Sequence, residues 1–189
     1  MPRRLIPFLV IFTILLLSVS SFASSRWVQV GASGPRKPIA TVLKSDATET
    51  IIRFEISGFW SRQVIENGET FNELRFPGYA TTMEIGRPEL PCIADLVAIP
   101  DRSGVNVSVV EFEEVVFGDY KVFPFQKPLF EGETRTGLEI DRAFYRSDKL
   151  YPKEPVSVGE PGTWRDLRVA RLQVNPIRSN PASGEIIVY

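Results

Sequence analysis

Few residues in this 189-residue sequence could carry out chemistry. There is no histidine, which excludes a Ser-His-Asp triad, a Cys-His dyad and a histidine-ligated metal. The single cysteine, Cys92, lies in the apolar run 90–94 without a neighbouring base, which favours a small buried side chain over a reactive thiol. One cysteine also cannot form an intramolecular disulfide.

Carboxylates are the remaining candidates for acid–base work. They cluster at Glu111 and Glu113, and again at Glu131 and Glu133. On a strand, Glu111 and Glu113 share one face and Phe112 points the other way, which is typical of a solvated strand face over a core. No acid, base or nucleophile is visibly positioned, so we expect a non-catalytic protein without a cofactor or a metal.

The N-terminus has the pattern of a secretory signal peptide. Arg3 and Arg4 precede an apolar run over residues 5–19, and small side chains follow at Ser21 and Ala23. The apolar run is short for a membrane span, so we expect cleavage after Ala23 rather than anchoring. The sequence therefore predicts a signal peptide over 1–23 and export to the periplasm, the cell surface or the medium, with no membrane attachment after cleavage.

Residues 24–189 are enough for one domain with a core of its own. The whole chain has a formal net charge of −1, and its charges are mixed rather than clustered. A nucleic-acid partner is therefore not expected, because phosphate backbones require a basic stripe.

Short strands are predicted throughout this domain, because apolar and polar residues alternate in many short runs and none has a sustained helical period. Asn67-Gly68 between two such runs predicts a hairpin, since both residues tolerate a positive φ. The other predicted strands lie at 48–57, 96–99, 105–109, 115–117, 120–123, 167–174 and 185–189. With 15 prolines and 13 glycines between them, we expect an all-β fold, an antiparallel β-sandwich that is jelly-roll-like.

Residues 126–151 are the exception, since they are rich in charge and weakly patterned. A connection of this length in a compact domain is usually functional or flexible.

The hexapeptide Gly86-Arg87-Pro88-Glu89-Leu90-Pro91 also stands out. Its two prolines fix φ and remove two amide donors, which predicts a rigid crossover with Leu90 in the core. Together with the segments 76–79, 97–100, 145–152, 168–176 and 180–181, in this order, it resembles the prodomain of gingipain-type cysteine peptidases.

The resemblance implies a β-sandwich that precedes a caspase-like catalytic domain, keeps it latent by covering its cleft and assists its folding. The partner is then a gingipain-like catalytic domain, in cis or in trans. A basic side chain of the prodomain could occupy an acidic specificity pocket of that domain. The candidates in the 126–151 connection are Lys127, Arg135, Arg142 and Arg146, and Arg135, between two threonines, is the best candidate for an exposed tip.

Two features depart from the family pattern. Ser179 stands where an aromatic residue is expected before Asn180-Pro181, and the sequence stops at Tyr189 inside a predicted strand. We therefore expect the chain to be the front of a longer precursor. The alternative is a secreted β-sandwich binding module, for instance for carbohydrate, with Trp27, Trp60 and Trp164 as a stacking platform.

Overall fold

The structure is a computed structural model that describes residues 24–31, 34–46, 48–101 and 104–189. The signal peptide predicted over residues 1–23 lies outside these ranges. Where the chain is described, its elements are β1 (Arg26–Gln29), β2 (Ile39–Ser45), β3 (Thr50–Glu55), β4 (Gly58–Glu66), β5 (Glu69–Arg75), β6 (Ala80–Thr81), β7 (Pro91–Ala98), β8 (Val115–Phe117), the 3₁₀ helix η1 (Phe144–Arg146), β9 (Val156–Val158), β10 (Gly162–Trp164), β11 (Leu167–Val174), β12 (Ile177–Asn180) and β13 (Glu185–Val188).

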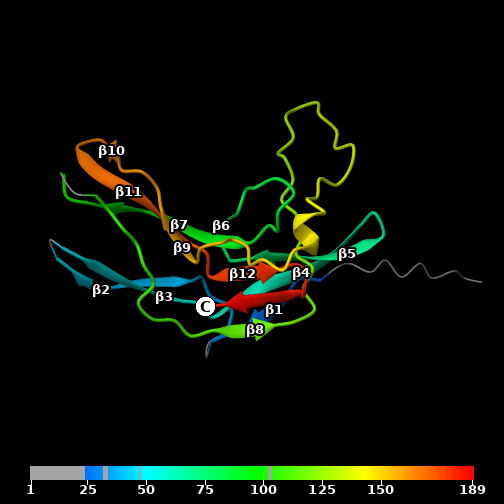
Figure 1. The fold of residues 1–189 in the computed structure, drawn as a ribbon, viewed down its shortest axis with the longest axis horizontal. Coiled ribbons are helices and arrows are strands. Elements are labelled where there is room, and N and C mark those ends of the chain that lie inside the picture. The colour runs from blue at the N-terminus through cyan, green and yellow to red at the C-terminus, as the bar shows by residue number, and fades with distance from the viewer. Residues whose placement is uncertain (1–23, 32–33, 47, 102–103) are drawn as a thin grey trace, which may run out of the picture.

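The strands form several antiparallel sheets, so the predicted all-β fold is confirmed (Figure 1). The strand orders are β1-β4-β5, β10-β11-β7-β6 with β9 also paired to β11, β12-β13-β8, and β2-β3. Every ladder between these strands is antiparallel. The last strand, β13, is central in its sheet and is hydrogen-bonded on both edges.

The hairpin predicted at Asn67-Gly68 joins β4 to β5. Both turn residues have a positive φ, 52° and 78°, which the two-residue turn requires for the strands to keep their right-handed twist. Glu66 and Glu69 are the last residues paired across the ladder. The turn chemistry thus sets the register that places Phe71 and Leu74 of β5 in the core.

The core collects side chains from most of the sheets. Phe59, Leu74, Leu90, Ile177 and Ile186 all have 0% exposure and belong to one buried cluster. Each contributes about 1.5–3 kcal/mol by leaving water. The cluster joins the β1-β4-β5 sheet to the β12-β13-β8 sheet around the crossover that carries Leu90.

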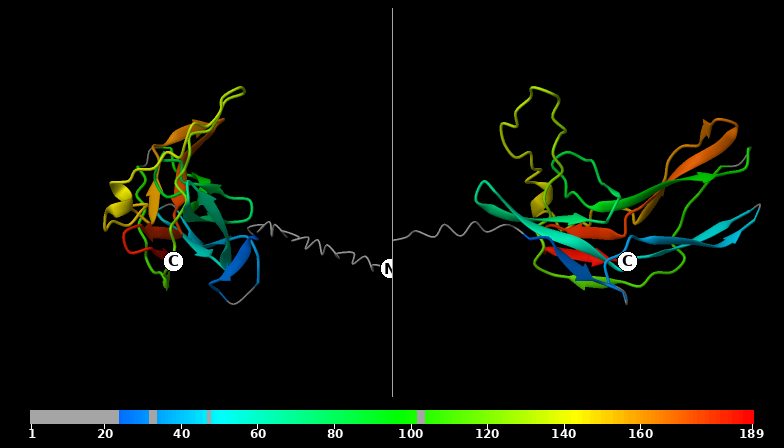
Figure 2. Two further views of the ribbon diagram at one scale, coloured as in Figure 1. Left: turned by 90° about the vertical axis from the view of Figure 1, so that its right-hand side faces the viewer. Right: turned by 180° about the vertical axis from the view of Figure 1, so that it is seen from behind.

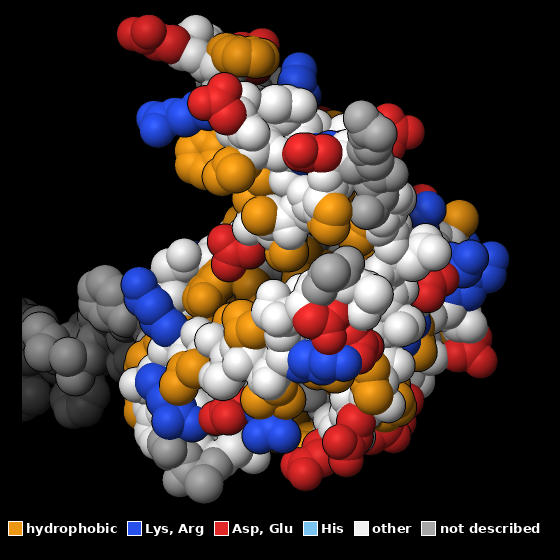
Figure 3. Space-filling model, turned by 90° about the vertical axis from the view of Figure 1, so that its left-hand side faces the viewer, with side chains coloured by type: hydrophobic (Ala, Val, Ile, Leu, Met, Phe, Trp, Pro, Cys, Tyr) orange, Lys and Arg blue, Asp and Glu red, His pale blue; other side chains and the backbone are white. Residues whose placement is uncertain are grey.

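Two parts of the sheets extend away from this core as arms (Figure 2). One is the β2–β3 hairpin, and the other is the far end of β7, β10 and β11. Both expose large apolar side chains, including Val42 on the first arm and Trp164 and Leu167 on the second. On the face shown in Figure 3, apolar side chains gather in a hollow between the upper and lower parts of the molecule, with charges of both signs around it.

Two strand predictions are wrong. Residues 120–123 form no strand, and only Val122 makes a bridge there, an isolated one to Asn72 of β5. Residues 104–114 form no strand, although Val105, Val107 and Val109 alternate with polar residues. Phe112 does not point to the core: it is 58% exposed, and its ring packs edge-on against Tyr189 with centroids 5.2 Å apart. Alternation alone does not make a strand, because a strand is stabilised by cross-strand pairs, and this segment has no ladder partner until β8 begins.

Helical structure in the described ranges amounts to η1, and none of it is long and apolar enough to cross a membrane.

Candidate functional site

The most prominent feature outside the sheets is a loop that rises clear of them, which we call the protruding loop (residues 127–140; yellow-green in Figures 1 and 2). All residues from 127 to 137 are exposed, and none is in a strand or a helix. The predicted connection at 126–151 is therefore confirmed as free of strands, and η1 is the only helical turn that the structure describes within it.

The tip of the loop has one internal support, a turn over residues 130–133. The amide of Glu133 donates to the carbonyl of Phe130 at 3.0 Å, and the Glu133 carboxylate accepts from the Phe130 amide at 3.2 Å. Gly132 supplies the positive φ of 86° that this turn needs. Residues 133–136, which include Arg135, then follow without helix, strand or turn.

A buried glutamine closes the base of the loop. Gln126 is only 8% exposed. Its side-chain amide nitrogen donates to the Glu139 carbonyl at 2.8 Å and to the Pro124 carbonyl at 2.9 Å. Its oxygen accepts from the Glu139 amide at 2.9 Å. This two-way pairing mimics a strand ladder and holds the two ends of the loop together.

Gly86, the first residue of the hexapeptide, ties both ends of the loop to the rest of the fold. Its amide donates to the Phe125 carbonyl at 2.9 Å, and its carbonyl accepts from the Asp141 amide at 3.0 Å. The φ of Gly86 is 77°, and a Cβ here would lie 2.9 Å from the Asp141 nitrogen. A larger residue would therefore be strained and would push the returning chain away.

Arg87 fills the space beneath the returning chain. Its guanidinium lies 3.3 Å from the Glu84 carboxylate and 3.4 Å from that of Asp141. It also stacks over the Phe144 ring of η1, with its central carbon 3.9 Å from the centroid. Such a planar cation can satisfy carboxylates and an aromatic face at once, which a lysine does less well.

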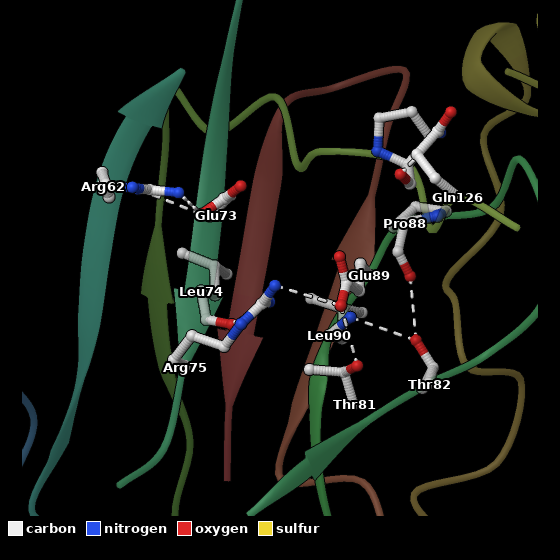
Figure 4. Close-up of polar contacts among 11 residues, drawn as sticks. Arg62, Glu73, Leu74, Arg75, Thr81, Thr82, Pro88, Glu89, Leu90 and Gln126 are labelled. Atoms are coloured by element: carbon white, nitrogen blue, oxygen red, sulfur yellow. Dashed lines mark hydrogen bonds and ion pairs between the residues drawn. The ribbon is translucent and has the colours of Figure 1, made fainter. Parts of the chain in front are cut away.

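The remainder of the hexapeptide is fastened to the core (Figure 4). The Thr82 hydroxyl donates to the Pro88 carbonyl and accepts from the Leu90 amide, both at 3.0 Å. The Glu89 carboxylate pairs with Arg75 at 3.0 Å. The predicted burial of Leu90 is confirmed at 0% exposure. The hexapeptide is thus a rigid foot that connects the protruding loop to the core.

The four predicted site residues are not brought together. Lys127 and Arg135 are exposed within the protruding loop, and Arg146 is the exposed last residue of η1. Arg142 lies just after the loop, with its guanidinium 3.4 Å from the Glu69 carboxylate. Gln126 and Gly86 were not predicted as functional. The only sequence signal for them was their place beside a long connection and two prolines.

Among the described residues, no cluster of three or more Cys, Asp or Glu side chains is placed so that it could hold a metal ion. Cys92 is 2% exposed, so its predicted burial is confirmed, and this burial raises the pKa of its thiol. Burial likewise raises the pKa of Tyr151 to about 12, which keeps its hydroxyl protonated near neutral pH. The arrangement can bind a partner but offers no activated nucleophile.

The proposed tryptophan platform does not form. Trp27 of β1 and Trp60 of β4 are partly buried and pack edge-on against each other, with centroids 5.4 Å apart. Trp164 belongs to β10 in a different sheet. No single surface therefore presents all three rings.

Comparison with known proteins agrees with this description. The family model Propeptide_C25 matches residues 32–189. Lys-gingipain of Porphyromonas gingivalis is 26% identical over 180 residues, covering 92% of this chain and 10% of that protein. Gingipain R2 of the same organism is 20% identical over 155 residues, covering 82% of this chain and 21% of its own length. The chain thus spans about a tenth to a fifth of these relatives.

Two solved structures share the fold. One, from work on the zymogenic latency of gingipain K from Porphyromonas gingivalis, has a TM-score of 0.73 at 24% identity, covering 87% of this chain and 93% of that one. The other, a complex of the RgpB pro- and mature domains from the same organism, has a TM-score of 0.74 at 20% identity and covers 82% of both chains. Because the family model spans most of the chain, the protein belongs to the Propeptide_C25 family and is a non-catalytic, gingipain-type propeptide domain.

Proposed function

We propose that this chain keeps a gingipain-like cysteine peptidase latent and assists its folding, by placing the protruding loop in the cleft of the catalytic domain. The domain acts in cis as the N-terminal part of a precursor, or in trans on the separate catalytic domain. Membership of the propeptide family supports this role, as do the two structures of the same fold, whose subjects are zymogenic latency and a complex of pro- and mature domains.

The observation that carries the proposal is the contrast within the loop. Gln126 and Gly86 fix both ends, while residues 127–137 are exposed and available to a partner. A loop that is held at its base loses less conformational entropy on binding than a free segment, so more of its contact energy appears as affinity.

Arg135 is the residue that we place in the specificity pocket. It lies in the stretch 133–136, which has no internal helix, strand or turn and can pair as extended backbone with a partner. Arg142 is engaged with Glu69, and Arg146 is in η1, beyond the loop. Lys127 adjoins the clamp at Gln126, so its main chain has little freedom to enter a cleft.

The same proposal includes removal of the signal peptide and the arrangement of the sheets as a sandwich. Residues 1–23 are removed as a signal peptide during export, and residues 24–189 form a jelly-roll-like β-sandwich prodomain. The exported protein then acts in the periplasm, at the cell surface or in the medium. The carbohydrate-binding alternative is not favoured, because the three tryptophans do not share a surface.

Inhibition assays test the proposal. The purified chain is titrated against active gingipain-type peptidases that cleave after arginine or lysine, alongside Arg135→Ala and the alanine variants of Lys127, Arg142 and Arg146. We expect Arg135→Ala to raise the inhibition constant by about 30-fold or more, as for the loss of a hot-spot side chain worth about 2 kcal/mol. The other three variants should change it far less.

The matched control is Arg53→Ala, since Arg53 is an exposed arginine of β3 outside the loop. Equal inhibition by the wild type and by the four alanine variants at Lys127, Arg135, Arg142 and Arg146 would show that none of these basic side chains is needed for inhibition. Absence of inhibition by the wild-type chain against every such peptidase would overturn latency itself.

A further inference from the structure

Beside the foot of the protruding loop, the described residues form an open trough of about 960 Å³. One wall is the segment from β6 to Arg87, and the other is the segment 149–154, with Phe144 of η1 at one end. In Figure 1 these segments meet near the labels β6, β9 and β12. The protruding loop itself does not line the trough.

The floor of the trough is one face of a sheet. Arg171 and Gln173 alternate along β11 and therefore point to the same side. Ser157 of β9 is paired directly with Gln173 and shares that side. The floor is thus polar and built on regular strands, which are more rigid than loops.

The charge of the trough is opposite to that of the protein as a whole. Five lining side chains are basic and two are acidic, a local balance of +3, whereas the whole chain has a net charge of −1. The basic members are Arg87, Lys149, Lys153, Arg171 and Arg178, and the acidic ones are Glu84 and Glu154. Such a local excess attracts carboxylates and speeds their encounter.

Two of these cations are committed to the fold. Arg87 pairs with Glu84 and Asp141, and Arg178 donates to the Pro152 carbonyl at 2.9 Å and to the Tyr189 hydroxyl at 3.1 Å. Lys149 and Arg171 are different. Both side chains are exposed, and neither side chain has a hydrogen bond or an ion pair with another described residue. They rise from separate parts of the trough, one from a connecting segment and one from β11.

Two uncharged side chains of the trough, Asn175 and Gln173, are held in place by hydrogen bonds. Asn175 is 4% exposed, donates to the Glu154 carbonyl at 2.9 Å and accepts from the Gln173 amide at 3.1 Å. Gln173 is therefore held at the floor with a second amide hydrogen left for a ligand. A preformed cleft with a few fixed polar groups is the usual form of a ligand site.

We propose that this trough binds an extended peptide segment rich in carboxylates, with Lys149 and Arg171 as its main cationic contacts. Glu84 and Glu154 in the lining disfavour a uniformly dense polyanion such as a sulfated polysaccharide, whereas a peptide can space its carboxylates around them. The proposal does not depend on the protruding loop or on inhibition.

Fluorescence anisotropy with a labelled peptide of alternating glutamate and alanine tests this site. The purified chain should bind the peptide saturably, and binding should weaken as salt is raised. Arg171→Glu and Lys149→Glu should each weaken it at least tenfold. Arg53→Glu, at an exposed arginine of β3 outside the trough, should leave it unchanged. Circular dichroism checks that each variant is folded. Because Lys149 and Arg171 lie in different parts of the chain, one variant suffices if the other misfolds.

Several results would overturn the proposal. These are an absence of saturable binding to the wild-type chain, equal binding by the wild type and both trough variants, or an equal loss with Arg53→Glu. Tight binding of heparin with no binding of the peptide would reassign the trough to polysaccharides. A chain that binds the peptide but inhibits no peptidase would leave the trough proposal standing and defeat only the latency proposal.

Discussion

The foot and the tip of the protruding loop differ in how firmly the rest of the molecule holds them. At the foot, Gly86 and Gln126 are joined by hydrogen bonds to both ends of the loop, and Leu90 lies fully in the core. At the tip, residues 127–137 are exposed and have only the turn at 130–133 as support. The fold thus fixes where the loop emerges and leaves its tip to adapt to a partner.

The largest expected difference between these regions is in stability. Phe59 is fully buried in the cluster that supports the foot, whereas Phe130 at the tip is 72% exposed. Phe59→Ala should reduce the free energy of unfolding by about 3–5 kcal/mol, since it removes transferred surface and leaves a cavity. Phe130→Ala should change it by no more than about 0.5 kcal/mol. Urea unfolding followed by fluorescence measures both.

Phe130→Ala is the control for loss of an aromatic ring as such. A similar loss of stability in both variants would mean that the tip is as firmly packed as the core, and the contrast between foot and tip would fail.

A smaller difference is expected between two glycines with similar positive φ angles. Gly86 at the foot and Gly132 at the tip have φ of 77° and 86°. A Cβ at Gly132 would meet nothing within 4 Å, while one at Gly86 would lie 2.9 Å from the Asp141 nitrogen. Gly132→Ala should therefore reduce the free energy of unfolding by only about 1–2 kcal/mol, the cost of a left-handed backbone for a residue with a Cβ. Gly86→Ala should reduce it by more, because the backbone hydrogen bonds at the foot must also shift.

Thermal unfolding of the two variants separates these effects, and hydrogen exchange at the Asp141 amide reports on the foot directly. Faster exchange at Asp141 is expected in Gly86→Ala and not in Gly132→Ala. Equal melting temperatures and equal exchange would show that the close approach at Gly86 is not limiting.

The foot and the tip also differ in how far the sequence predicts them. The hairpin at Asn67-Gly68, the strand over 167–174 and the burial of Leu90 follow from local rules, and all are confirmed. The loop itself follows from the absence of a pattern over 126–151. These features depend on residues near one another in the chain, where turn chemistry and alternation act.

The hydrogen bonds made by Gln126 and Gly86 could not be predicted in this way. The bond of Gln126 to Glu139 spans 13 residues, and Gly86 meets Phe125 and Asp141 across still longer separations. A glutamine or a glycine carries no local sign of such contacts. The strand predicted at 105–109 does not form for the same reason. Alternation of apolar and polar residues does not reveal whether a partner strand lies alongside.

The smallest effect concerns the ionic contacts outside the foot. Glu69, at the start of β5, accepts a hydrogen bond from Lys121 and lies 3.4 Å from Arg142, just beyond the loop. The Lys121 hydrogen bond, more than any other contact, lowers the pKa of the Glu69 carboxyl below its usual 4.5. Since the folded state holds the ionised form more tightly than the unfolded state does, this contribution is present above pH 4.5. It is lost as the pH falls through the lowered value.

Lys121→Met removes the charge and retains an apolar stem over the Phe71 ring, where the Lys121 nitrogen lies 4.8 Å from the centroid. Melting temperatures between pH 6 and pH 3 should fall less steeply in this variant than in the wild type. Because both partners are exposed, the difference should be small and should shrink in high salt. Lys149→Met, which removes an exposed lysine without an ion pair to the described residues, should leave the wild-type slope unchanged. If Lys121→Met also kept that slope, the contact between Lys121 and Glu69 would add nothing to the stability of the fold.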